Sequence, residues 1–313
     1  SAIMRALGDS KTPLYFLVLT SALNVGLDLY FIIVFDMGVF GAALATDLSQ
    51  AISGVASFVY MLRRFTMLRM QPGETRPDRA ISARLLGMGL PMGLQCSITA
   101  IGSVIMQSAV NMLGSVAVAA VTAAGKTQNL LTVPLESVGT AMATYAGQNL
   151  GASRLGRICR GTRSAMVLVV GYSLAALVAL HYCDVLIIGL FLDTAAEVTI
   201  VSMAREYMFW NSLFFIPLGA LIVWRYVIQG LGYATLAMMA GVAEMVARIA
   251  VAVALVPWLG YFGAELSNPA AWVAACLFLL PAYRWTIGQL ANRMHARRLA
   301  ALHKLGLQET PPR

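Results

Sequence analysis

Long apolar runs, separated by short polar or glycine-containing turns, follow one another along the whole chain. A helix needs roughly 20 mainly apolar residues to cross a bilayer, whereas strands of a membrane barrel are runs of about 10 residues of alternating polarity. The runs are of the longer kind, so we expect an all-α integral membrane protein. They predict eight transmembrane helices, at about 13–35, 40–62, 84–112, 116–146, 160–192, 198–229, 234–257 and 264–290.

Four of these predicted spans are longer than a bilayer requires, which indicates tilt, kinks or extension into water. They are the spans at about 84–112, 116–146, 160–192 and 198–229. The expected kink points are Pro91, Pro134 and Pro217, because a proline inside a helix removes one backbone hydrogen bond.

Composition agrees with a membrane protein: 59% of the 313 residues are apolar, 12% are charged and the mean hydropathy is +0.76. The cationic residues that flank the spans all fall on one side; they are Arg5, Lys11, Arg63, Arg64, Arg69, Arg76, Arg79, Arg84, Arg154, Arg157, Arg160, Arg163, Arg293, Arg297, Arg298 and Lys304. The opposite turns, near Asp36 and Gly114 and at 184–197 and 258–262, contain no Lys or Arg. Because cytoplasmic loops carry the excess of Lys and Arg, both ends of the chain are expected in the cytoplasm.

This topology also explains the net charge of +8, so no nucleic-acid partner is expected. The basic tail, 293–313, is expected to be a solvated helix, with binding to anionic lipid as the alternative.

The four cysteines, Cys96, Cys159, Cys183 and Cys276, have the spacing of neither a disulfide framework nor a metal site. No Walker loop, G-x-S-x-G, H-E-x-x-H or dinucleotide fingerprint is found, so an ATP-driven pump, an enzyme and a bound cofactor are not expected.

The first two spans are repeated near the end of the chain. A shift of 224 residues places Leu7-Gly8 on Leu231-Gly232, and after a two-residue gap the stretch at 38–42 falls on 260–264. An even number of spans separates the copies, so they share one orientation, as in parallel repeats. The second copy is preceded by four spans without a counterpart before the first, so we expect about four helices upstream of Ser1.

The repeat therefore predicts four parts. They are the end of a first six-helix lobe (1–63), a cytoplasmic linker (64–83), a complete second six-helix lobe (84–292) and the basic tail.

A polar pair, Asn24 and Asp28, lies inside the apolar stretch TPLYFLVLTSALNVGLDLYFIIVF. Their spacing of four places them on one face of a helix, and at 1.5 Å per residue Thr46 of the next span is level with Asp28. A carboxylate at membrane depth is costly without a partner, so Asp28 is a candidate proton or Na⁺ site in a transporter. The alternative is a buried carboxyl group that only joins two helices. Asp47 is at similar depth but about 100° around its helix from Thr46, and both a role as partner and a place at the membrane edge stay open.

The second lobe carries further candidates for coupling or for lining a cavity. Glu244 and Arg248, at i and i+4, form either a structural ion pair or part of the coupling machinery. Lys126 lies near the middle of its span, about three turns from Glu136, and is expected to face the bundle interior. Residues at five positions are possible substrate contacts, although such residues more often only pack or hydrogen-bond between helices; they are Gln95, Asn111, Gln128, Asn129 and Trp210.

Several stretches together resemble the multidrug and toxic compound extrusion (MATE) family, in its prokaryotic DinF-like branch. They are IMRALGDSKTPLYF, GAALATDLSQ, GLPMGLQ, GTAMATYAGQNLGA and IQGLGYATLAMMAGVAEMVAR, within residues 1–292. The resemblance implies a twelve-helix antiporter of two six-helix lobes around a central cavity, of which this chain would hold the last two helices of the first lobe and all of the second. It also implies a cation site at Asn24, Asp28 and Thr46, completed by an aspartate on a first helix that would lie upstream of Ser1.

The expected function is therefore secondary active efflux of organic cationic or amphipathic compounds in exchange for H⁺ or Na⁺. The expected setting is the inner membrane of a prokaryote, with a monomeric protein in contact with membrane lipid. The alternative is a flippase for lipid-linked saccharides, which would need a larger cavity lined by several arginines. A membrane enzyme with a carboxylate dyad is disfavoured, because Asp28 and Asp47 lie on different helices without metal ligands.

Overall fold

A computed structural model describes residues 2–68, 78–188 and 198–304, and in these ranges the chain contains helices and no strand. Part of the predicted linker, part of the turn at 184–197 and the last nine residues of the basic tail lie outside the described residues. The chain divides into two compact units, Ser1–Ser82 and Ala83–Arg313, which we call the first and second units.

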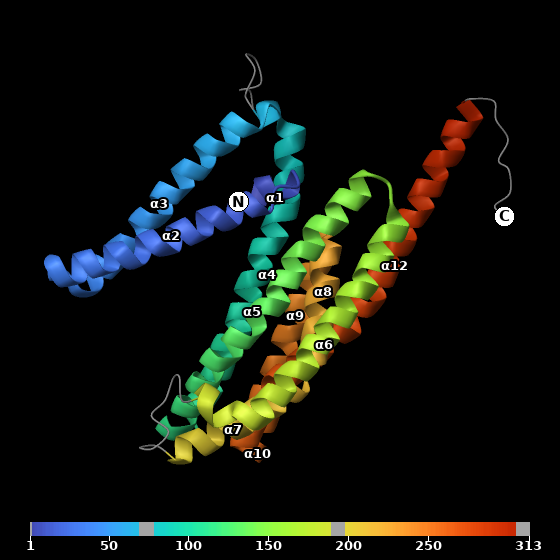
Figure 1. Ribbon diagram of the computed structural model, residues 1–313. Coiled ribbons are helices and arrows are strands. Elements are labelled where there is room, and N and C mark those ends of the chain that lie inside the picture. Colours follow the sequence, from blue (N-terminus) through green and yellow to red (C-terminus); the bar gives the residue numbers. More distant parts are fainter. Residues whose placement is uncertain (1, 69–77, 189–197, 305–313) are drawn as a thin grey trace. The chain divides into compact units, whose positions relative to one another are not determined.

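The first unit is a helical hairpin. After the short α1 (Ala2–Ala6), α2 (Lys11–Leu29) continues as a π-helical turn, η1 (Tyr30–Val34), and packs against α3 (Gly38–Arg64), which is followed by the 3₁₀ turn η2 (Thr66–Leu68) (Figure 1). Asp9 accepts the Thr12 backbone N–H at 3.1 Å, which satisfies one free donor of the first turn of α2. The hydrogen bonds from Thr12 also hold the pKa of Asp9 below its ordinary value. Pro13 lies in the same turn, where its missing N–H has no helical partner to lose.

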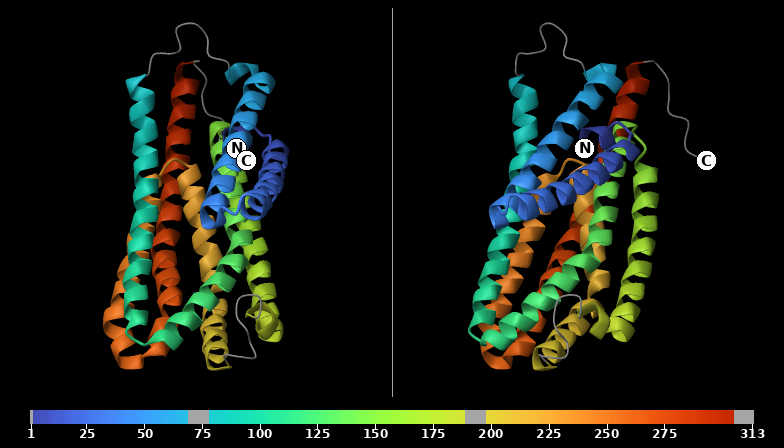
Figure 2. Two further views of the ribbon diagram at one scale, coloured as in Figure 1. Left: turned by 90° about the vertical axis from the view of Figure 1, so that its left-hand side faces the viewer. Right: turned by 60° about the vertical axis from the view of Figure 1, so that its left-hand side comes forward.

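The second unit is a bundle of long helices. In chain order these are α4 (Arg79–Asn111), which begins just before the unit boundary, α5 (Ser115–Gly151), α6 (Leu155–Ile188), α7 (Val198–Leu213), α8 (Phe215–Gly230), α9 (Ala234–Ala250), the π turn η3 (Val251–Leu255), α10 (Val256–Leu259), α11 (Tyr261–Glu265) and α12 (Ser267–Lys304). α8 lies at the centre, packed against α5, α6 and α12, while α9 packs on α12 (Figure 2).

Small residues bring these central helices close together. A Cβ added at Gly139 of α5 would lie 2.5 Å from Tyr226 Cδ2 on α8, and one added at Gly219 of α8 would overlap Val169 on α6. The aliphatic core around these contacts includes Leu135, Val169, Leu221, Val227 and Leu279, each at most 2% exposed. Backbones without a side chain between them approach closely, which is the usual basis of helix association in membranes.

The internal repeat predicted from the sequence is present in the backbone. The glycines at 8 and 232 have φ of +92° and +89°, and those at 38 and 260 have φ of +53° and +57°. Such positive values favour glycine, because a Cβ would clash with the neighbouring backbone. In both copies the first helix also ends in a π-helical turn, η1 and η3. The repeat is therefore one of local conformation as well as of residue type.

The helical segments follow the eight predicted spans in order, with boundaries shifted by a few residues. Six of the described helical segments are long and apolar enough to cross a membrane, and the broken pair α7–α8 makes a seventh if it is one span. α5 is not among them, and it carries Lys126, Glu136 and a series of hydroxyl and amide side chains. The predicted tail begins as a continuation of α12, which runs to Lys304.

Of the three prolines expected to kink helices, Pro217 lies nearest to a break. α7 and α8 meet at Phe214 with a bend of 53°, and Pro217 is in the first turn of α8, where its missing N–H has no helical acceptor to lose. α5 also bends along its length (Figure 2), and Pro134 is the proline inside it. α4 continues as one helix through Pro91.

Candidate functional site

Two helices of the first unit bring Asn24 and Thr46 together. The Asn24 side-chain amide donates a hydrogen bond to Thr46 Oγ1 at 3.2 Å, and the Thr46 hydroxyl donates to the Ala42 carbonyl oxygen at 3.0 Å. This contact joins α3 to α2 at Asn24, one turn from Asp28, the residue that the sequence predicted to be level with Thr46.

Asp28 lies one turn from Asn24 and is half-buried. Its Oδ1 atom is inaccessible and has no hydrogen-bond partner among the described residues, and the π-helical turn η1 begins two residues later. A buried carboxylate oxygen without a donor is unfavourable unless a proton or cation satisfies it. π-helical turns also recur at functional sites, because they re-aim side chains within a helix. Asp47, in contrast, is exposed on α3.

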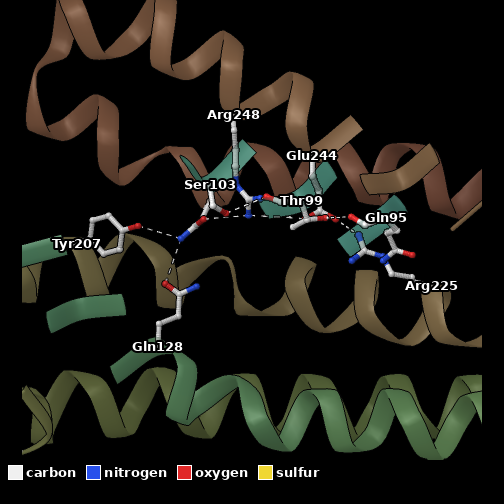
Figure 3. Close-up of polar contacts among 9 residues, drawn as sticks. Gln95, Thr99, Ser103, Gln128, Tyr207, Arg225, Glu244 and Arg248 are labelled. Carbon is white, nitrogen blue, oxygen red and sulfur yellow. Dashed lines mark hydrogen bonds and ion pairs between the residues drawn. The ribbon is translucent and has the colours of Figure 1, made fainter. Parts of the chain in front are cut away.

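In the second unit, charged side chains from α8 and α9 meet in the bundle interior. Arg225 of α8 donates a hydrogen bond to Glu244 Oε1 of α9, and both side chains are nearly buried. Arg248, one turn along α9 from Glu244, lies 4.0 Å from the other carboxylate oxygen, Oε2. The predicted pair of Glu244 and Arg248 is thus in contact, but the closer partner of Glu244 is an arginine from another helix (Figure 3).

Asn268, in the first turn of α12, connects this cluster to α5 and α7. Its carbonyl oxygen accepts from Arg248 at 3.5 Å, and its amide donates to Gln128 Oε1 at 3.4 Å and to the Tyr207 hydroxyl oxygen at 3.1 Å. Gln128 was expected from the sequence as a substrate contact, and Figure 3 shows its side chain extending from α5 toward these groups. Five helices, α5, α7, α8, α9 and α12, therefore contribute to one polar network.

Gln95 of α4 makes a separate polar contact, beside Gly241 of α9. It accepts a hydrogen bond from the Gln229 amide of α8 at 2.9 Å and is 9% exposed. α4 can approach α9 here because Gly241 has no side chain: an added Cβ would lie 3.1 Å from Gln95 Cγ. Further along α4, Gly102 allows the same close approach to α9, because an added Cβ would lie 3.2 Å from Met245 Cα.

The remaining predicted residues lie outside this network. Lys126 is exposed on α5 and has no hydrogen-bond or ion-pair partner in the part of the chain that the structure describes. Glu136, also on α5, accepts a hydrogen bond from the Tyr226 hydroxyl at 2.6 Å. Asn129 is exposed, and Asn111 accepts from Gln107 at 3.1 Å near the end of α4. Trp210 packs edge-to-face against Phe262, with ring centroids 5.3 Å apart.

Sequence reasoning missed Arg225, Tyr207 and Asn268. Arg225 had a clear signal, since it is a charged residue inside the apolar stretch FIPLGALIVWRYVIQG, and such residues mark functional sites by default. Glu265 had the same signal. It is fully buried at the end of α11, and neither carboxylate oxygen has a partner among the residues described. Tyr207 and Asn268 carried no comparable signal, because hydroxyls and amides are common inside membrane helices.

Comparisons with known proteins agree with this architecture. Residues 91–254, just over half of the chain, match the family model MatE. Among curated proteins, the chain is 30% identical over 236 residues to the probable multidrug resistance protein YpnP of Bacillus subtilis, a match that covers 74% of this chain and 51% of YpnP. It is 26% identical over 157 residues to the probable multidrug resistance protein NorM of Thermotoga maritima, covering 48% of this chain and 33% of NorM.

Solved structures show the same fold. An outward-facing multidrug resistance MATE family transporter matches with a TM-score of 0.85 at 23% identity, covering 93% of this chain and 65% of that one. A MATE transporter in a straight conformation matches with a TM-score of 0.83 at 24% identity, again over 93% of this chain and 65% of the other. The chain spans about half the length of the curated relatives YpnP and YoeA. The family match and the shared helical fold lead to one conclusion: the chain belongs to the MatE family of membrane transporters.

Proposed function

We propose that this chain is part of a secondary transporter that exports amphipathic organic compounds in exchange for H⁺ or Na⁺. The family and the relatives named as multidrug resistance proteins support efflux of small organic molecules. The sequence contains no nucleotide-binding or hydrolase motif, which favours an ion gradient as the energy source.

The observation that carries the coupling role is the Asp28 carboxyl group, with one inaccessible and unpartnered oxygen, beside the Asn24–Thr46 hydrogen bond. Carboxylate, amide carbonyl and hydroxyl oxygens are hard ligands that suit a proton or Na⁺. Loading the site would neutralise a charge at membrane depth, and unloading would restore it. The loaded, neutral site and the unloaded, charged site therefore favour different conformations of the transporter, as alternating access requires.

The setting follows from the charge distribution. The cationic flanks on one side favour an inner-membrane protein with both ends of this chain in the cytoplasm. A monomer is the simplest functional unit, with lipid around it and with H⁺ or Na⁺ as the coupling ion.

A flippase for lipid-linked saccharides is the second candidate, because the second unit contains two nearly buried arginines, Arg225 and Arg248. A flippase would use them against a pyrophosphate group. The relatives named for multidrug resistance favour efflux of solutes over this alternative.

Transport in proteoliposomes tests the proposal. The native protein is reconstituted, and a pH gradient or a Na⁺ gradient is imposed separately while the movement of a fluorescent amphipathic dye is followed. One of the two gradients should drive dye transport, and the matching ionophore should abolish it. Dye transport that needs ATP, or that neither gradient affects, would contradict the proposal.

A further inference from the structure

Arg248 is a buried cation whose donors are poorly used. Its side chain is 8% exposed, and its Nη1 atom has no partner among the described residues. The contacts of Nη2, 3.5 Å to Asn268 Oδ1 and 4.0 Å to Glu244 Oε2, are both long. A well-formed hydrogen bond from a guanidinium to a carboxylate is about 2.7–2.9 Å. The guanidinium, which stays charged at any working pH, therefore lacks a close anionic partner.

The nearby carboxylates are committed elsewhere or are not bonded to it. Glu244 makes its close ion pair with Arg225, and Glu136 accepts the hydroxyl of Tyr226. Neither oxygen of Glu265 has a partner in the described part of the chain. A buried charge left without compensation is strongly destabilising, so a position of this kind indicates a group that arrives from outside the chain.

A polar stripe on α4 leads to this guanidinium. Its members follow at intervals of four residues, so each is the neighbour of the next, and over its length the row winds about 160° around the helix; they are Gln95, Thr99, Ser103, Gln107 and Asn111. Asn111, Gln107 and Ser103 are exposed, Thr99 is half-buried and Gln95 is buried. In Figure 3 Ser103 and Thr99 lie on either side of the Arg248 guanidinium, and a Cβ added at Gly102 would lie 3.5 Å from Arg248 Cδ. The hydroxyls of Thr99 and Ser103 donate to backbone oxygens of α4 at 3.0 and 3.1 Å, and the row leads from exposed residues at the end of α4 to the cation.

We propose that Arg248 binds an acidic group of the transported molecule, a carboxylate or phosphate ester, so that the substrates are amphipathic acids or zwitterions rather than purely cationic compounds. This inference rests on the proposed efflux function and names its substrate class. The planar guanidinium presents paired donors that match a carboxylate in bidentate geometry. Asn268 holds Arg248 from one side, and Glu244 keeps Arg225 occupied, so one cation is left for the ligand.

A matched pair of dyes tests this assignment. Rhodamine B carries a free carboxylate, whereas its ethyl ester differs only in having that group blocked. Binding of each to the purified native protein is measured by fluorescence anisotropy in detergent. We expect rhodamine B to bind about tenfold more tightly than the ester, the size of effect given by one charged hydrogen bond.

Variants then locate the effect. Arg248→Gln should bind both dyes equally, and Arg248→Lys should keep part of the preference. Glu244→Gln should increase it, because a competing carboxylate is removed; a purely structural cluster would give no such increase. Arg163→Gln, which removes an exposed arginine on α6, should behave as the native protein. Equal binding of the two dyes by the native protein, or a preference that survives in Arg248→Gln, would overturn the inference.

Two further arms separate related explanations. Repeating the titration in phosphatidylcholine nanodiscs with and without phosphatidylglycerol tests a lipid phosphate as the ligand. Competition by phosphatidylglycerol that Arg248→Gln removes would assign the site to lipid and overturn the substrate assignment. The binding assay needs no gradient. A preference for rhodamine B without gradient-driven transport would therefore leave the anion site standing and refute only the proposed function.

Discussion

Glu244 on α9 forms its close ion pair with Arg225 on α8, whereas Arg248, one turn along its own helix, lies 4.0 Å from it. The close ion pair therefore joins α8 to α9, whereas the longer contact lies within α9. A local pair and a pair between helices respond differently to mutation, which makes the arrangement testable.

Removing one member of the close pair should leave a buried charge without its partner. Glu244→Gln and Arg225→Gln are each expected to lower the free energy of unfolding by about 3–5 kcal/mol, and Arg248→Gln by less, because its contact with Glu244 is long. Exchanging Glu244 and Arg248 should recover little, since the exchange moves the carboxylate away from Arg225. Thermal unfolding in detergent measures all four variants. Full recovery by the exchange would show that the local pair dominates.

Close packing of α5 on α8 should depend on Gly139. A Cβ there would lie 2.5 Å from Tyr226 Cδ2 and 2.7 Å from Ile222 Cγ2, so Gly139→Ala should destabilise the protein by about 1–3 kcal/mol. Gly125 on the same helix has open space around it and provides the matched control. Gly125→Ala should be neutral or slightly stabilising, because alanine favours helix more than glycine does. Equal melting temperatures for the two variants would contradict the close approach.

Lys126 provides a test of function without a stability effect. It is exposed and has no partner among the described residues, so Lys126→Gln should change stability by no more than about 0.5 kcal/mol. If the lysine lines the transport pathway, efflux should nevertheless fall, and Lys126→Arg should restore part of it. Dye efflux and melting temperature are measured on the same preparations. Unchanged efflux in Lys126→Gln would assign the lysine to an ordinary solvated surface.

The order of the helices and the internal repeat could be predicted from the sequence because both depend on local pattern. Apolar runs mark the helices, and the matched glycines at 8 and 232 mark a turn that needs positive φ. A kink was expected at Pro217, three residues after the break at Phe214, but the size of that bend and the two π-helical turns could not be predicted, since they depend on how each helix meets its neighbours.

The candidate site likewise has a part that the sequence predicted and a part that it did not. Asp28 and Thr46 were expected to be level, and the hydrogen bond of Thr46 is to Asn24, one turn from Asp28. The partner of Glu244 could not be found from helical spacing, because Arg225 precedes it by 19 residues and reaches it only through the packing of α8 beside α9. The position of Arg225 within an apolar run was the available signal. The coupling role of Asp28 and the part played by Lys126 in transport stay predictions.

The most direct test of the account is coupled efflux by Asp28→Asn in everted membrane vesicles that contain the native protein or the variant. Asparagine keeps the size of the side chain but carries no negative charge and takes up no proton, so the variant should fold and insert normally. The matched control is Asp36→Asn, at an exposed position after η1. We expect gradient-driven dye efflux to be abolished in Asp28→Asn and kept in Asp36→Asn. Efflux by Asp28→Asn at the native rate, with the native dependence on the ion gradient, would contradict the assignment of Asp28 as the coupling site.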